Sequence, residues 1–299
     1  MHEFLHILEH SLLDSIKLLP FLFIAFFIIE LIEHKLSEKS KKVISKSGKY
    51  GPILGSLLGL IPQCGFSVVA TNLYITRILS LGTLISVYLS TSDEMLVILL
   101  SRNASISTIL PLLGTKFIVG LISGFIIDFL LRNKKKEKQT YSICEDEHCG
   151  CEEEENLLKS SLIHTIKTFI FIFKATFIIT LVFELFGEEY LSKLLLKDTL
   201  ISPFITSLIG LIPNCASSVI LTELYLSNSI NFASEISGLL TGSGVAILVL
   251  FKSNKNIKEN LTILSLVYGI GVITGIIITL ITYIIKDYIS SLFIIINKY

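Results

Sequence analysis

The sequence predicts an all-α membrane protein: a polytopic helical bundle of two inverted repeats, each with about five helical pieces. Three observations support this prediction: the composition, the length of the uncharged stretches and a motif that occurs twice. Hydrophobic residues make up 52% of the 299 residues, a share that soluble domains rarely carry because they must cover their surface with polar groups. The uncharged stretches run about 17–25 residues, the length a helix needs to cross about 30 Å of hydrocarbon. They do not alternate polar with apolar residues as barrel strands do.

Two polar segments interrupt the apolar stretches and divide the chain. Residues 34–49 hold six lysines, and residues 132–159 begin basic and then become rich in Cys, His and acidic residues. The expected organisation is a first transmembrane repeat (1–131), a linker (132–159) and a second transmembrane repeat (160–299). The apolar stretches lie at residues 15–33, 51–76, 79–100, 106–131, 160–186, 201–227, 230–251 and 261–285.

The two halves repeat at an offset of 151 residues. GLIPQCGFSVV at residues 59–69 aligns with GLIPNCASSVI at residues 210–220 without a gap. A shared core of this kind, with further matches at the same offset, does not arise from chance similarity between apolar stretches. Transporters are commonly built from such repeats, with the substrate site where the repeats meet. The further matches pair Pro52 with Pro203, Thr71 with Thr222, Tyr74 with Tyr225, Gly120 with Gly271 and Gly124 with Gly275.

Each repeat has one apolar stretch that contains Pro-x-Cys near its middle, with prolines at Pro62 and Pro213. Proline lacks an N–H and clashes with the preceding turn, so a continuous helix must kink or break there. Residues 51–76 therefore form either one kinked crossing or a re-entrant hairpin of two half-helices. Lys and Arg collect in cytoplasmic loops, so the two basic segments, 34–49 and 132–159, should both be cytoplasmic. An even number of crossings must then separate these segments. Because residues 79–100 and 106–131 supply two crossings, residues 51–76 must contribute none, which favours the hairpin.

The hairpin interpretation predicts the topology of the whole chain. Each repeat then crosses the membrane three times, and this odd number makes the repeats inverted. Sixteen Lys and Arg residues fall in cytoplasmic segments and six outside. We expect a multi-pass protein of the inner or plasma membrane, with a cytoplasmic linker and both termini outside. Zero net charge argues against a nucleic-acid partner, so the expected partners are the bilayer and a small solute, while a homo-oligomer stays open.

The tips of the two hairpins are the first candidate binding site. A broken helix exposes backbone groups that lipid cannot satisfy, and its ends present dipoles that can hold an ion. The tips carry Gln63 and Cys64 in the first repeat, and Asn214 and Cys215 in the second. Because an amide and a thiol occur at both tips, we expect one central site formed by the two. The alternative is that proline and small residues only kink packed helices.

Two adjacent acids in an apolar stretch, Asp93 and Glu94, are the second candidate. An unpaired charge at this depth costs at least about 2.5–3.5 kcal/mol, so a cation, a proton or a partner must compensate it. The two carboxylates either bind a transported cation and exchange protons, or form a structural ion pair with Lys116 or Lys174.

Two further polar residues occupy equivalent positions about two turns beyond the tips. They are Asn72 in the first repeat and Glu223 in the second. They are either secondary ligands of the central site or interfacial residues, and the sequence does not choose between these roles.

The linker offers a separate candidate metal site. Cys144, His148, Cys149 and Cys151 place three thiols and an imidazole within eight residues, among acids. Cys and His at such spacing can bind one soft or borderline metal ion. We expect some metal affinity, as a cytosolic capture or sensing arm. The alternative is a disordered acidic tether.

Five motifs carry a resemblance to a known family: GLIPQCG (59–65), NLY (72–74), TSDEM (91–95), GLIPNCASS (210–218) and ELY (223–225). Together with the Cys/His linker they resemble a family of ten-helix heavy-metal exporters, some described as manganese transporters or arsenic efflux proteins. The resemblance spans nearly the whole chain and implies a heavy metal as substrate. Glycine commonly stands in that family where this chain has Gln63, Asn214 and Ala216, a difference that bears on the substrate more than on the fold.

The expected function is a secondary transporter that exports a divalent metal cation through a central site, with no catalytic residue and no cofactor besides the transported ion. Carboxylates and amides form an oxygen-rich set that suits Mn²⁺, the favoured ion, whereas thiols suit Zn²⁺, Cd²⁺ or trivalent arsenic. The alternative is an arsenical or other small-solute permease. A membrane-embedded enzyme is less favoured, because the six histidines lie near helix ends or in loops. No nucleotide-binding motif occurs, so we do not expect ATP hydrolysis.

Overall fold

The computed structural model describes residues 12, 15–16, 18–24, 26–27, 50–131, 157–186 and 199–296. It describes only the backbone of Asp93, Leu157, Ser160, 182–186 and 289–296. Within these residues the regular elements are helices, and five segments are long and apolar enough to cross a membrane. The predicted class, a polytopic helical membrane protein, is confirmed. The five segments are Leu81–Ser101, Ile106–Leu131, Ser161–Leu181, Phe232–Ser253 and Ile257–Tyr288.

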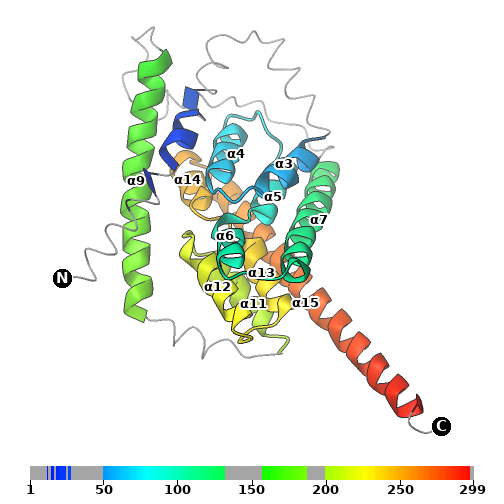
Figure 1. The fold of residues 1–299 in the computed structure, drawn as a ribbon. Helices are drawn as coiled ribbons and strands as arrows, with labels where there is room; N and C mark the ends of the chain where they lie inside the picture. Colours follow the sequence, from blue (N-terminus) through cyan, green and yellow to red (C-terminus); the bar gives the residue numbers. More distant parts are fainter. Residues whose placement is uncertain are drawn as a thin grey trace.

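Most corresponding helices of the two halves begin, and several also end, at equivalent sequence positions. The bounds of α4 and α12, and of α5 and α13, differ by 151 residues at both ends, and α7 and α15 begin at the same offset. α3 and α4 lie toward one end of the bundle and α11 and α12 toward the other, with α9 along its side (Figure 1). The bounds are α3 (Gly51–Gly59), α4 (Gly65–Ile75), α5 (Leu81–Ser90), α6 (Asp93–Ser101), α7 (Ile106–Leu131), α9 (Leu157–Phe186), α11 (Ser202–Gly210), α12 (Ala216–Leu226), α13 (Phe232–Thr241), α14 (Ala246–Ser253) and α15 (Ile257–Ile296).

The first Pro-x-Cys stretch forms two antiparallel half-helices, α3 and α4. α3 runs parallel to α5, because Gly51 lies against Thr83 near the start of α5 and Gly59 lies against Ser90 at its end. α4 must return toward its origin, because only a short turn joins its end to the start of α5. The half-helices have 9 and 11 residues. At 1.5 Å per residue they are about 14–17 Å long, roughly half the hydrocarbon thickness.

The second repeat has the same arrangement. The Ser234 hydroxyl of α13 donates to the Ser202 hydroxyl of α11 at 2.7 Å, at the start of both helices. The Thr241 hydroxyl, at the end of α13, donates to the Ser207 carbonyl near the end of α11 at 2.8 Å. α12 then returns to the start of α13, so the structure has hairpins in place of kinked crossings at both Pro-x-Cys motifs.

Prolines set the bounds of the first half-helix in each hairpin. Pro52 and Pro203 lie in the first turns of α3 and α11, where a helix leaves the N–H groups unpaired in any case. Pro62 and Pro213 disfavour the helical conformation of the residue before them, so both helices end at the glycine three positions earlier.

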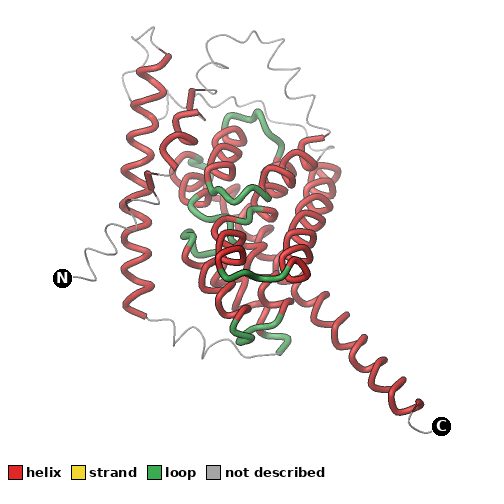
Figure 2. Tube along the Cα trace, in the orientation of Figure 1, coloured by secondary structure: helices red, strands yellow, loops and turns green. Residues whose placement is uncertain are grey.

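The stretch at residues 79–100, expected as one continuous crossing, is broken in the middle. The break separates α5 from α6, and an equivalent break separates α13 from α14. Ser92 stabilises the first break: its N–H donates to the Gly59 carbonyl at 3.1 Å and its hydroxyl to the Leu60 carbonyl at 2.7 Å. These breaks and the hairpin tips lie in the middle of the bundle (Figure 2).

Small residues allow close packing within each repeat, and the hairpins join the repeats to each other. The Ser86 hydroxyl of α5 donates to the Gly120 carbonyl of α7 at 3.0 Å. Such approach is typical of helices in lipid, which lack a hydrophobic driving force for association. Between the repeats, α4 packs on α14 and α12 packs on α6. Each hairpin therefore contacts the broken crossing of the other repeat.

The close approach of α5 and α7 makes Gly124 intolerant of a side chain. A Cβ there would lie 1.9 Å from the Ser86 hydroxyl and 2.7 Å from the Gly82 carbonyl. We expect Gly124→Ala to lower the free energy of unfolding by about 1–3 kcal/mol. Gly114, on the same helix, has no atom within 4 Å of a Cβ, so Gly114→Ala should be neutral or slightly stabilising. Thermal unfolding in detergent, followed by circular dichroism, measures both, and equal melting temperatures would contradict this packing.

Candidate functional site

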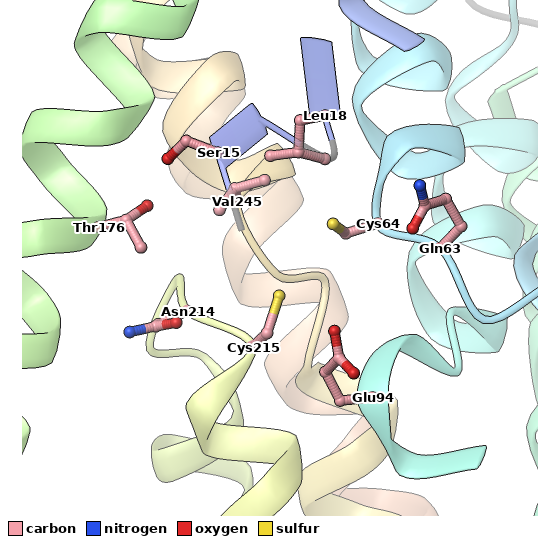
Figure 3. A pocket seen from close by; sticks show the side chains of 9 residues that line it. All are labelled: Ser15, Leu18, Gln63, Cys64, Glu94, Thr176, Asn214, Cys215 and Val245. Atoms are coloured by element: carbon pink, nitrogen blue, oxygen red, sulfur yellow. The ribbon is translucent and has the colours of Figure 1, made fainter. Parts of the chain in front are cut away.

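A pocket lies between the repeats, where the two tips approach the two helix breaks (Figure 3). Gln63 and Cys64 reach it from the first tip, Asn214 and Cys215 from the second, and Glu94 from the start of α6. Both thiols and the carboxylate point toward a common space. The structure thus brings five predicted residues together. The full lining is Ser15, Leu18, Gln63, Cys64, Glu94, Thr176, Asn214, Cys215 and Val245.

The pocket is small, with room for about one water-sized species. It would accept a dehydrated ion more readily than a hydrated one. No group of three or more His, Cys, Asp and Glu side chains within the described part of the chain is close enough to hold a metal ion. Binding a metal here would therefore require the lining groups to move toward one another.

Four half-helices begin at the pocket. Cys64, Cys215 and Val245 are the N-cap residues of α4, α12 and α14, and Glu94 is the second residue of α6. A helix N-terminus carries partial positive charge and stabilises negative groups beside it. The pocket thus favours thiolates, carboxylates or an anionic solute over a bare cation. Half-helix ends were predicted only at the two tips, because the two helix breaks leave no clear pattern in the sequence.

Equivalent serines fix the backbone of the two cysteines. The Ser67 hydroxyl donates to the Cys64 carbonyl at 2.7 Å, and the Ser218 hydroxyl donates to the Cys215 carbonyl at 2.8 Å. Ser67 and Ser218 are related by the repeat offset of 151 residues. Both tips therefore have the same local geometry, with the cysteine at the start of the second half-helix.

The second tip is also fixed by its amide. Asn214 Nδ2 donates to the Thr180 hydroxyl of α9 at 3.0 Å, and Asn214 Oδ1 accepts from the Ala216 N–H at 3.3 Å. The amide thus positions the tip against α9. To bind a metal ion, the Asn214 amide would have to break these hydrogen bonds.

Two hydroxyl groups in the lining were not among the predicted residues. Ser15 comes from the N-terminal segment and Thr176 from α9. Thr176 Oγ1 is buried and has no hydrogen-bond partner among the described residues. A single threonine in an apolar crossing carries no sequence signal, so only the fold could reveal its position.

The other predicted site residues do not line this pocket. Asn72 is fully buried on α4, and neither atom of its amide has a hydrogen-bond partner among the described residues. Glu223 forms an ion pair with Arg102 at 2.9 Å, which favours its interfacial interpretation. The structure does not describe the Asp93 side chain or the linker residues Cys144, His148, Cys149 and Cys151.

Lys116 and Lys174 were the candidate ion-pair partners of Asp93 and Glu94, and the structure places them in different environments. Lys116 is fully buried on α7 and donates to the Leu239 carbonyl of α13. Lys174, on α9, is exposed.

Ion pairs between described residues join the repeats away from the pocket. Arg77 follows α4 and binds Glu259, in the first turn of α15, with 2.6 and 3.0 Å hydrogen bonds. These hydrogen bonds raise the pKa of Arg77. Arg102 precedes α7 and binds Glu223 near the end of α12. Each pair thus connects a loop of the first repeat with a helix of the second.

The Arg102–Glu223 pair is expected to contribute little to the stability of the fold. The two side chains are 62% and 39% exposed, and exposed pairs are worth about 0–1 kcal/mol. We expect Glu223→Gln to lower the free energy of unfolding by less than about 1 kcal/mol. Transport of any substrate should stay at the wild-type level. Thermal unfolding and a transport assay on the same preparation measure both effects. Loss of transport would indicate that Glu223 takes part in substrate binding.

The fold and the pocket define the class of protein. Discontinuous helices that meet at a small polar pocket between two repeated halves are the architecture of a solute transporter. The chain belongs to the family described as "Putative, 10TM heavy-metal exporter", whose model matches residues 6–187 and 170–294. It is thus a multi-pass membrane protein of a heavy-metal exporter family, as its motifs indicated. Comparisons with curated proteins and with solved structures found no match.

Proposed function

We propose that this chain exports a divalent heavy-metal cation and binds it in the pocket between the two tips. Family membership supports heavy-metal export in general. The observation that carries the proposal is that Cys64, Cys215 and Glu94 line one pocket. These groups supply two thiols and a carboxylate from both repeats, so an ion bound to all three would link the two halves of the transporter.

The donors of the described residues favour a thiophilic ion, Zn²⁺ or Cd²⁺. Thiolate ligands select such ions, whereas Mn²⁺ prefers an oxygen shell. The helix N-termini add to this preference, because they oppose a bare cation and stabilise the thiolate form that binds metal. Manganese, which the sequence favours, depends on the carboxylate and amide oxygens and is the comparison ion.

Trivalent arsenic is the second candidate substrate. The four helix N-termini at the pocket favour electron-rich oxygen atoms, which the uncharged hydroxide As(OH)₃ can supply. Trivalent arsenic also binds thiolates. Both thiols would then be essential, whereas Glu94 would not.

We propose that transport proceeds by rocking of two inverted repeats around the pocket, with no catalytic residue and no resident cofactor. Support comes from the repeated helix bounds and from the hairpins at opposite ends of the bundle. The distribution of Lys and Arg supports a cytoplasmic linker and termini outside. The linker thiols would then collect metal on the cytoplasmic side.

Whole-cell metal content tests this proposal. Cells that express the wild type or the double variant Cys64→Ser/Cys215→Ser are loaded separately with zinc, cadmium, manganese or arsenite. Elemental mass spectrometry then measures each element. We expect wild-type cells to hold less zinc and cadmium than cells with the variant. A difference confined to arsenic would support the second candidate. Equal zinc and cadmium contents in the two kinds of cell would contradict the proposed thiol site, and cells that hold less manganese than cells without the protein, with either form expressed, would support an oxygen-centred site.

A further inference from the structure

Glu235, on α13, is a buried acid that the proposed metal site does not use. Its side chain has no exposed surface. Glu235 Oε1 accepts a hydrogen bond from the Thr222 hydroxyl at 3.2 Å, and Oε2 has no hydrogen-bond partner among the described residues. The equivalent position in the first repeat is Leu84, so the fold of a repeat does not require an acid there. A carboxylate in this place is costly unless a proton or a cation compensates its charge.

Lys116 is a cation that acts on Glu235 across the boundary between the repeats. Its ammonium group lies on α7 of the first repeat and donates to the carbonyl of Leu239, one turn beyond Glu235. Lys116 and Glu235 interact electrostatically. Their attraction exists only while Glu235 is ionised, so protonation of Glu235 weakens one link between the two repeats.

Other titratable groups on the neighbouring helices have different roles. Tyr225 of α12 interacts electrostatically with Glu235. Tyr88 of α5 shares a hydrogen bond with Thr71 at 2.6 Å. α11 has no titratable residue. On α15, Glu259 pairs with Arg77 and the Tyr268 hydroxyl donates to a backbone carbonyl, while Lys258, Tyr283, Lys286, Asp287 and Tyr288 complete its titratable residues.

Glu235 shares two helices with the pocket. Its hydrogen-bond partner Thr222 lies on α12, about two turns after Cys215 at the start of that helix. Its own helix, α13, leads into the break that ends at Val245, which lines the pocket. A metal ion in the pocket and a charge on Glu235 therefore act on the same two half-helices.

We propose that Glu235 binds the proton that is exchanged for the metal ion, an inference that rests on the proposed function. One proton binds the Glu235 carboxylate when the metal leaves the pocket on one side of the membrane. The same proton is released to the other side before the next metal ion binds. Because Glu235 has no exposed surface in this conformation, its proton can exchange only when the repeats move. This requirement couples proton movement to alternating access.

The test uses the full-length chain in liposomes and radioactive zinc as the probe. Zinc-for-zinc exchange without a pH gradient needs no net proton movement, whereas zinc uptake driven by a pH gradient does. We expect Glu235→Gln to keep exchange and to lose gradient-driven uptake by about tenfold or more, a typical size for coupling between two sites. Glu235→Asp, which can still titrate, should keep both activities. Glu223→Gln, which removes an acid from the neighbouring α12, is the matched control and should also keep both.

Each outcome decides between the two proposals. If the wild type moves no zinc in either assay, the proposed function fails. If the wild type exchanges zinc but a pH gradient does not drive uptake, the metal site stands and the role of Glu235 is overturned. Gradient-driven zinc uptake by the Glu235→Gln variant would also overturn the proposed role of Glu235. Loss of both activities in a Glu235→Gln protein that remains monodisperse would assign Glu235 a purely structural role.

Discussion

Glu94→Gln is expected to abolish zinc and cadmium export. Glu94 supplies a carboxylate to the pocket, and glutamine keeps the shape of the side chain but removes its charge. Loss of a group that only orients a metal ligand already lowers affinity by about 10–100-fold. We therefore expect loss of this charged donor to lower metal affinity by about 100-fold or more. Zinc uptake into liposomes at several zinc concentrations measures the effect.

The matched control for this variant is Glu223→Gln, which neutralises an acid outside the pocket. The two variants change net charge equally, so a difference between them reports position and not overall charge. Transport by Glu94→Gln at the wild-type rate and affinity would exclude Glu94 as a ligand. Arsenite transport that survives in this variant while zinc transport is lost would indicate that the pocket accepts both substrates through different donors.

Cys64→Ser combined with Cys215→Ser is expected to change the preferred metal. A serine hydroxyl keeps the size of the side chain but replaces a soft sulfur donor with a hard oxygen. We expect cadmium affinity to fall by about 100-fold, while manganese affinity changes little. Metal binding to the purified protein measures both affinities. The linker thiols Cys144, Cys149 and Cys151 must first be replaced by serine, because they would bind the same ions.

The two single variants provide an internal check on this result. If both thiols bind one ion, each single variant loses most of the cadmium affinity and the double variant loses little more, because residues that share a ligand are not additive. Additive losses would indicate that each thiol contributes independently. An unchanged cadmium affinity in all three variants would remove both thiols from the binding site.

Much of the fold could be predicted from local chemistry. Pro62 and Pro213 interrupt apolar stretches, and the helices end shortly before them as steric rules require. The offset of 151 residues, visible in the two Pro-x-Cys motifs, also relates the helix bounds. Five of the predicted site residues line one pocket, and four of these are amides and thiols at broken helix ends, which have few other places in lipid.

The helix breaks before α6 and α14 could not be predicted from the sequence alone. The first depends on hydrogen bonds from Ser92 to the carbonyls of Gly59 and Leu60 at the end of α3, which are more than thirty residues away in the chain. The roles of Glu223 and Glu235 were hidden for the same reason. Arg102 pairs with Glu223 from a different repeat, and Lys116 comes near enough to Glu235 to interact electrostatically only after α7 and α13 have come together. Such long-range partners leave no pattern in neighbouring residues.

X-ray absorption spectroscopy of the zinc-loaded protein tests most directly whether Cys64 and Cys215 bind one metal ion. The chain has five cysteines, so replacement of the three linker cysteines by serine leaves only these two as thiol ligands. We expect a sulfur shell at about 2.3 Å from zinc, which disappears in the Cys64→Ser/Cys215→Ser variant. A zinc spectrum with only oxygen and nitrogen neighbours at about 2.0–2.2 Å in both proteins would contradict this prediction.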